Sequence, residues 1–112
     1  MREQPELLAQ RQLDAYNARD IDAFISCYSE DVEVYNYPAT LAYKGRAAMR
    51  ERYAAYFQSA PELHCELVNR ITIGNKVIDR EKITGRPDGK IAHAVALYEV
   101  VNGLIAKVFF IK

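Results

Sequence analysis

Apolar residues recur at helical spacing through the first half of the chain. Pro5 suits the first turn of a helix that is expected over residues 5–18. Asp20 is a residue type that caps helix N-termini, and the residues after it predict a second, short helix. A third helix is predicted over residues 45–59 and is closed by Pro61. The apolar stripes of the second and third helices are Ile21, Phe24, Ile25 and Tyr28, and Met49, Tyr53, Tyr56 and Phe57.

After the third helix, the apolar period shortens from about 3.6 residues to about 2, which is typical of strands. Four strands joined by tight turns are predicted over residues 63–73, 76–84, 91–101 and 104–112. An earlier strand is predicted over Val32–Tyr37, and a loop over Ala39–Lys44. Helices grouped against one face of a mostly antiparallel sheet give an α+β fold, here a single domain over residues 1–112.

The alternation also predicts which strand side chains point inward. Along residues 63–73, one face is expected to carry five apolar side chains and the other face the polar ones. In the last strand Val108 and Phe110 lie opposite Phe109 and Ile111, so both of its faces are apolar. A monomer buries two such faces with difficulty, and a homodimer through the outer face of the sheet is therefore expected. The five apolar residues are Leu63, Cys65, Leu67, Ile71 and Ile73, and the polar ones are His64, Glu66, Arg70 and Thr72.

Two carboxylates occupy an otherwise apolar strand face. Asp79 and Glu81 fall on the same face of the strand over residues 76–84. That face also carries two apolar residues and the other face two basic ones, so the acids are expected to point toward the helices. The register of the next strand decides what lies beside them. If Pro87-Asp88-Gly89 forms a three-residue hairpin loop, the acids share a face with His93, Val95 and Leu97; a register shifted by one residue places them with Ala94, Ala96 and Tyr98.

The two acids and His93 suggest proton-transfer chemistry. In a partly apolar cavity, burial raises the pKa of a carboxylic acid, and a nearby cation lowers it. Such a group can move a proton to and from a carbon acid near neutral pH. Glu81 is the expected catalytic base, with Asp79 and His93 adjusting it. The alternative is a solvated strand face on which the acids pair with basic neighbours across the sheet.

Tyrosine is frequent in this chain, with eight residues and no tryptophan. Tyrosines of the helix stripes are expected to face the core. A buried tyrosine needs a partner for its hydroxyl group, so several in one place either bond to one another or surround a small-molecule cavity. The candidate ligand-binding residues are Tyr16, Tyr28, Asn36, Tyr37, Tyr53, Tyr56, Phe57 and Leu97.

Composition and charge argue against several other classes of function. Fifteen Lys and Arg residues balance fifteen Asp and Glu residues, so binding to nucleic acid through overall positive charge is not expected. No apolar run approaches the ~20 residues of a membrane span. Cys27 and Cys65 are expected to be reduced core thiols of a cytoplasmic protein. The sequence contains no metal-ligand spacing and no nucleotide-binding glycine loop, so neither a metal nor a cofactor is expected.

The helical first half contains three distinctive segments, Leu13–Phe24, Tyr28–Val34 and Tyr43–Arg50. They resemble the nuclear-transport-factor-2-like superfamily, in particular its SnoaL-like and ketosteroid-isomerase-like members. The resemblance spans nearly the whole chain. It implies a curved sheet wrapped around three helices, a deep pocket in the resulting cone, and commonly a dimer through the sheet. It is much less specific for activity, because this scaffold hosts isomerases, cyclases, dehydratases and binding domains.

The catalytic residues of ketosteroid isomerases do not carry over with this resemblance. Asn36 or Tyr37 stands where those enzymes have their proton-shuttling aspartate. Their oxyanion-holding tyrosine aligns with Gln12, one turn before Tyr16, and their assisting acid falls near Leu97. A different polar set is therefore implied. We expect a small-molecule enzyme of the isomerase, cyclase or dehydratase type that acts on a hydrophobic carbonyl compound. The alternative is a non-catalytic dimeric domain that binds a hydrophobic small molecule.

Overall fold

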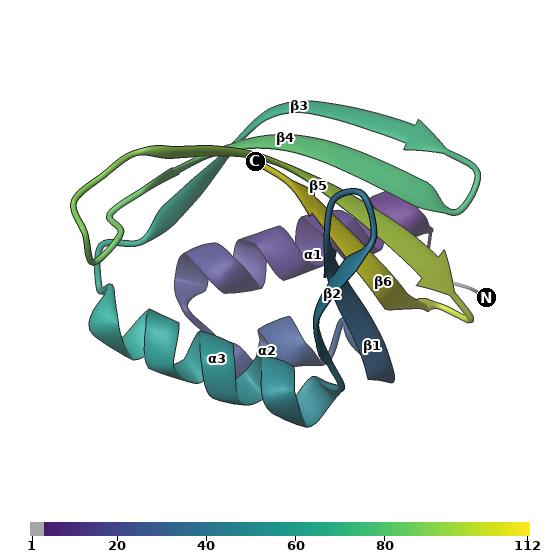
Figure 1. Cartoon of the computed structure of the whole chain (residues 1–112), viewed down its shortest axis with the longest axis horizontal. Coiled ribbons are helices and arrows are strands. Elements are labelled where there is room, and N and C mark those ends of the chain that lie inside the picture. Colours follow the sequence, from purple (N-terminus) through teal and green to yellow (C-terminus); the bar gives the residue numbers. More distant parts are fainter. Residues whose placement is uncertain (1–3) are drawn as a thin grey trace.

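Three helices lie inside the curve of one six-stranded sheet (Figure 1). The computed structural model describes residues 4–112. The helices are α1 (Pro5–Ala18), α2 (Ile21–Ile25) and α3 (Arg46–Ser59). The strands are β1 (Tyr28–Asn36), β2 (Thr40–Lys44), β3 (His64–Ile73), β4 (Lys76–Thr84), β5 (Ala92–Val101) and β6 (Leu104–Ile111).

The strands follow the order β2-β1-β6-β5-β4-β3 across the sheet. Each neighbouring pair is antiparallel except β1 and β6, which run parallel. The last four strands form the consecutive antiparallel series that the alternating pattern predicts, and their limits differ from the expected ones by at most one residue. The helices pack against the concave side, so the expected α+β fold is confirmed.

The end of α1 is fastened to the start of β3. The Asn17 side chain donates to the Cys65 carbonyl at 3.0 Å and accepts from the Cys65 backbone N–H at 2.7 Å, as a neighbouring strand would. Arg19, which ends the helix in a left-handed conformation, donates to the Leu63 carbonyl at 2.8 Å. Asp20 then caps α2 by accepting from the Ala23 N–H at 3.1 Å, as its residue type predicts. These bonds fix Cys65 beside the concave face.

The segment between the first strand and α3 differs from expectation. The loop predicted over Ala39–Lys44 is wrong, because Thr40–Lys44 forms β2 and pairs with β1. This strand is short, lies at the sheet edge and is exposed along most of its length, so it shows no apolar alternation. In addition, β1 begins at Tyr28, which therefore belongs to a strand and not to the second helix.

A β-bulge divides β3 into two halves of opposite orientation. Leu67 pairs with Glu81, and the next paired residue, Asn69, lies opposite Arg80, so Val68 is the extra residue. Beyond this point the alternation is inverted. Ile71 and Ile73 are 58% and 66% exposed on the convex side, and the expectation that they share the inward face of Leu63 and Cys65 is wrong. Arg70 turns inward in their place.

The core fills the space between the helices and the concave face. Phe24 lies at its centre, with ring centroids 4.7–5.7 Å from those of Tyr28, Tyr53 and Phe57. Both cysteines are buried and neither forms a disulfide bond with the other. The helices within residues 4–112 are too short or too polar to cross a membrane. The aromatic packing around Phe24 places the tyrosines of α3 against the sheet.

Candidate functional site

The observed register places both acids beneath the helices. Glu81 pairs with Ala94, and Asp79 with Ala96, so the acids share the concave face with these alanines and with Tyr98. This is the second of the two registers that the sequence allows. It arises because seven residues, 85–91, separate β4 from β5 in place of a three-residue loop. Glu81 is 6% exposed and Asp79 is fully buried.

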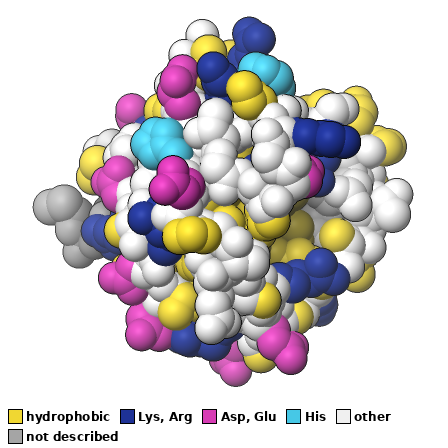
Figure 2. All heavy atoms as spheres, turned by 90° about the vertical axis from the view of Figure 1, so that its left-hand side faces the viewer, with side chains coloured by type: hydrophobic (Ala, Val, Ile, Leu, Met, Phe, Trp, Pro, Cys, Tyr) yellow, Lys and Arg dark blue, Asp and Glu magenta, His cyan; other side chains and the backbone are white. Residues whose placement is uncertain are grey.

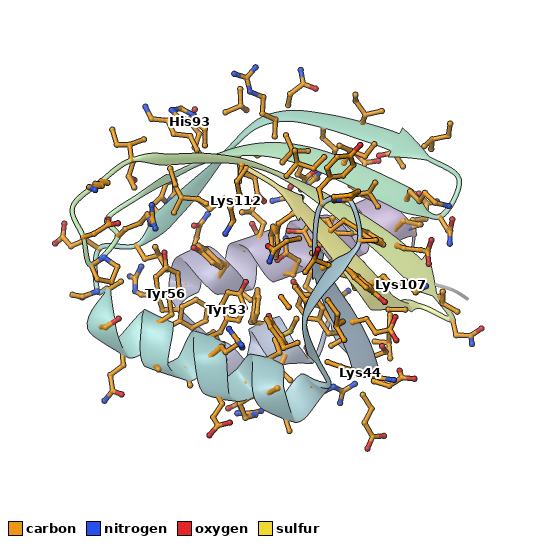
Figure 3. The ribbon with its side chains drawn as sticks, viewed as in Figure 1. Lys44, Tyr53, Tyr56, His93, Lys107 and Lys112 are labelled. Carbon is orange, nitrogen blue, oxygen red and sulfur yellow. The ribbon has the colours of Figure 1, made fainter. Side chains whose placement is uncertain are left out.

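The same register removes two predicted residues from the site. His93 lies opposite Lys82, and its side chain is exposed on the convex side of the sheet, although the residue borders the mouth of the cavity (Figure 3). Its expected position beside the acids is wrong. Leu97, opposite Ile78 and Phe109, is also on the convex face, so its expected place in the pocket is wrong as well.

The remaining predicted ligand-binding residues separate into three groups. Asn36 and Tyr37 are exposed at the end of β1 and line no cavity described below, so their expected position in the pocket is wrong. Phe57 is buried in the aromatic cluster behind the cavity wall. The other four face the interior: Tyr16, Tyr53 and Tyr56 line the main cavity, and Tyr28 lines a smaller one.

The main cavity has a volume of about 640 Å³ and lies between α1, α3 and the concave sheet. Figure 2 shows a hollow with a hydrophobic floor on this side of the molecule. In Figure 3, Tyr53 and Tyr56 project from α3 toward the sheet. A second cavity of about 70 Å³, large enough for a few water molecules, adjoins it. Glu81, Tyr16, Tyr53, Ile83 and Phe110 line both cavities.

Glu81 is the acid that borders these cavities, and its environment favours the protonated form. Burial, followed by the negative charge of Asp79, raises the pKa of the Glu81 carboxyl group from 4.5 to about 7. Hydrogen bonds from Cys65 and Tyr98 and the charge of Arg70 oppose this rise. Both protonation states of Glu81 are therefore populated near neutral pH, which suits a group that accepts and returns a proton.

Asp79 is instead held in an ion pair. Arg70 Nε lies 2.7 Å from Asp79 Oδ1, and Arg70 Nη2 lies 3.0 Å from Asp79 Oδ2. The third donor of this guanidinium, Nη1, donates to Gln10 Oε1 at 3.0 Å. Hydrogen bonding to Asp79 raises the pKa of Arg70 further. The ion-pair alternative thus describes Asp79, but on the buried face. Strict alternation along β3 predicts that Arg70 points outward. The bulge reverses its orientation, so the sequence does not reveal this ion pair.

A chain of buried hydrogen bonds ends at Glu81. Tyr28 Oη donates to Gln12 Oε1 at 3.0 Å, and Gln12 Nε2 donates to Tyr98 Oη at 3.1 Å. The Tyr98 hydroxyl, whose own proton is not used in the bond to Gln12, acts on Glu81 and lowers its pKa. Burial raises the pKa of both tyrosines well above 10, so they remain protonated donors. This chain orients the Glu81 carboxyl group from the side of α1 and β5.

Two hydrogen-bonded tyrosine pairs form much of the cavity wall. Tyr16 bonds to Tyr56, and Tyr53 bonds to Tyr43. Burial raises the pKa of Tyr16, Tyr43 and Tyr53, so these phenols stay neutral. The cavity wall therefore presents neutral hydroxyl groups that can donate to a bound molecule. Within residues 4–112, no group of three or more His, Cys, Asp or Glu side chains is placed to hold a metal ion.

The sequence and the fold belong to a known family. Residues 9–108 match the family model of the SnoaL-like domain, and the chain belongs to that family. A search of curated proteins found no match.

Solved structures of cystatin-like fold resemble the whole chain. A cystatin-fold protein from Novosphingobium aromaticivorans is 28% identical, with a TM-score of 0.90 and coverage of 98% of this chain and 99% of the other. A proposed ketosteroid isomerase from Kribbella flavida is 24% identical, with a TM-score of 0.81 and coverage of 98% and 78%. A proposed polyketide cyclase from Sinorhizobium meliloti is 22% identical, with a TM-score of 0.78 and coverage of 92% of both chains.

Proposed function

We propose that this protein is a small-molecule enzyme in which Glu81 moves a proton to and from a carbon atom next to a carbonyl group. The observation that carries the proposal is a buried carboxyl group with a pKa of about 7 that borders both cavities. Two of the similar solved structures are named as a proposed ketosteroid isomerase and a proposed polyketide cyclase, which supports an enzymatic role for the scaffold.

The proposed step begins with ionised Glu81. Its carboxylate takes a proton from the carbon atom, the electron pair of the broken C–H bond forms the C=C bond of an enolate, and the π pair of the C=O bond moves to the oxygen. A hydroxyl proton of the Tyr16–Tyr56 pair stabilises that oxygen. Protonated Glu81 then returns the proton to the same molecule. Isomerisation, cyclisation and dehydration can each start in this way.

Asp79 and Arg70 act in this scheme without touching the substrate. The charge of Asp79 raises the pKa of Glu81, and the charge of Arg70 lowers it. Because these two side chains form an ion pair, their opposing effects are held in a fixed geometry. Aromatic and aliphatic side chains make up much of the remaining lining, so the reacting molecule has a hydrophobic body.

The decisive experiment measures hydrogen–deuterium exchange at the carbon atom directly. Hydrophobic ketones are incubated with the protein in D₂O, and loss of the α-proton signal is followed by NMR. The wild-type protein should accelerate exchange, and Glu81→Gln should reduce that acceleration by about 100-fold or more. Glu99→Gln is the matched control, because Glu99 lies on the convex side next to Lys76 and Lys107. Equal exchange rates for the wild type and Glu81→Gln would contradict the proposal. Binding without any exchange would favour the binding-domain alternative.

We also propose that two copies pair through the convex face of the sheet. There Leu97 lies between Ile78 and Phe109, and the Phe109 ring stacks on Tyr35 at a centroid distance of 4.8 Å. A continuous apolar row thus crosses four strands. Light scattering should give the mass of a dimer, and Leu97→Glu should give a monomer with an unchanged circular dichroism spectrum. A monomeric wild-type protein would contradict this.

A further inference from the structure

Positive charge gathers at the rim of the main cavity. Three basic side chains line it, those of Arg52, Arg86 and Lys112, against the single carboxyl group of Glu81. The whole chain has a formal charge of zero, so this is a local excess. Figure 2 shows basic side chains at the edge of the hollow.

The basic side chains reach the rim from separate parts of the fold. Arg52 comes from α3, Arg86 from the loop between β4 and β5, and Lys112 follows β6. They are far apart in sequence, so no local repeat explains their meeting. The helix and the loop both border the cavity, so both arginines line the space that a bound molecule would fill.

Arg52 differs from the arginines that hold the fold together. Arg19 and Arg46 donate to backbone carbonyl groups, and Arg70 donates to Asp79. The Arg52 guanidinium instead lies over the Tyr43 ring at 4.3 Å from its centroid. Across residues 4–112 it has neither an ion pair nor a hydrogen bond with the protein. Its N–H donors are held in place by the ring and remain available to a ligand.

Arg86 is only lightly engaged. Its Nη2 atom lies 3.5 Å from Asp88 Oδ2 within the same turn, and both side chains are partly exposed. Exposed pairs of this kind contribute little, so a ligand carboxylate can compete with Asp88 for the guanidinium. Paired guanidinium groups suit carboxylate recognition, because each presents parallel N–H donors to two oxygens.

We propose that the molecule bound in this cavity carries a carboxylate group, held at the rim by Arg52 and Arg86, at the far end of a hydrophobic body that reaches Glu81. The charges set its orientation, because the carboxylate is attracted to the rim and repelled by an ionised Glu81. The volume of about 640 Å³ accommodates a molecule with two fused rings and a short acid chain. The identity of the reacting end rests on the proposed function, whereas the carboxylate site does not.

The test uses two probes that differ in one charge, 4-(2-naphthyl)-4-oxobutanoate and its methyl ester. Binding is measured by calorimetry at about pH 6, where the acid is ionised. The wild-type protein should bind the acid about tenfold more tightly than the ester. Arg52→Gln and Arg86→Gln should each remove most of this preference and leave ester binding unchanged. Arg80→Gln, on the exposed convex side of β4, is the matched control and should behave as the wild type does.

Other results would overturn the inference. These are equal binding of acid and ester by the wild type, binding of neither, or equal losses of both probes in the two arginine variants. Failure of the proposed function looks different: the Glu81→Gln variant and the wild type would both prefer the acid, and neither would accelerate exchange at its α-carbon. Catalysed exchange of acid and ester with no difference in affinity would reject the carboxylate site alone.

Discussion

The two buried carboxyl groups of β4, those of Asp79 and Glu81, have different surroundings. Asp79 and Glu81 are two residues apart, face the same side and are almost equally buried. Asp79 meets a guanidinium group that satisfies both of its oxygens. Glu81 meets the neutral donors Tyr98 and Cys65, and it borders open space. Burial can therefore raise the pKa of Glu81, because this carboxyl group has no direct cationic partner.

Removing the cation beside Asp79 should have the largest effect. Arg70→Met leaves a fully buried carboxylate without its partner, so the free energy of unfolding should fall by about 3–5 kcal/mol. Denaturant titration measures this loss. The double variant Arg70→Met/Asp79→Leu should recover most of it, because no buried charge remains. Arg80 is exposed on β4, the strand of Asp79, and Arg80→Met should change the free energy of unfolding by less than about 0.5 kcal/mol. A tolerated Arg70→Met would mean that the ion pair does not hold the fold.

The raised pKa of Glu81 should make the free energy of unfolding depend on pH. Its pKa is about 7 in the folded state against 4.5 ordinarily, so the folded protein binds the extra proton between these values. The stabilising contribution is complete below about pH 4.5 and is lost as pH rises through about 7, amounting to about 3 kcal/mol. Glu81→Gln should abolish this component and be more stable than the wild type at about pH 8. Parallel stability curves for the two proteins between pH 4.5 and 8 would show that Glu81 has an ordinary pKa.

Removing one of the neutral donors near Glu81 should have a smaller effect. The hydrogen bond from Tyr98 lowers the pKa of Glu81, so Tyr98→Phe should raise that pKa by less than about one pH unit. Stability should fall by about 1 kcal/mol, because Gln12 loses its hydroxyl partner. Carbon-13 NMR titration of the Glu81 carboxyl group measures the shift. Tyr35→Phe, which removes a bond to Glu33 on the other face, is the control and should leave the titration unchanged. A lower pKa in Tyr98→Phe would place the donor elsewhere.

Much of the architecture follows from periodicity, whereas the details of the site depend on small irregularities. The helical stripes and the alternation of β4 lead to the α+β fold and to inward-facing Asp79 and Glu81. Periodicity cannot count the residues in a loop that carries no apolar signal. It therefore leaves two registers open, and the expected catalytic position of His93 holds only in the one that does not occur. It also cannot locate a bulge such as that at Val68, which decides that Arg70 points inward.

The edge strand β2 escaped prediction for a related reason. Neither of its faces is buried enough to impose a pattern, so its pairing with β1 depends on backbone bonds and not on side-chain burial. The rim cations escaped as well. In the sequence, Arg52 and Arg86 resemble ordinary surface residues. Only the fold shows that a helix and a distant loop bring both of them to the same cavity.

The extra residue in β3 makes the strand sensitive to length as well as to side-chain identity. Deleting Val68 would remove the extra residue and leave a regular ladder in which Leu67, Asn69 and Arg70 keep their partners, so Arg70 would still face Asp79. Inserting or deleting a residue at a paired position of β3 would instead turn part of the strand over, so that inward side chains would face outward. When relatives are aligned, a gap placed one residue away would match inward positions with outward ones.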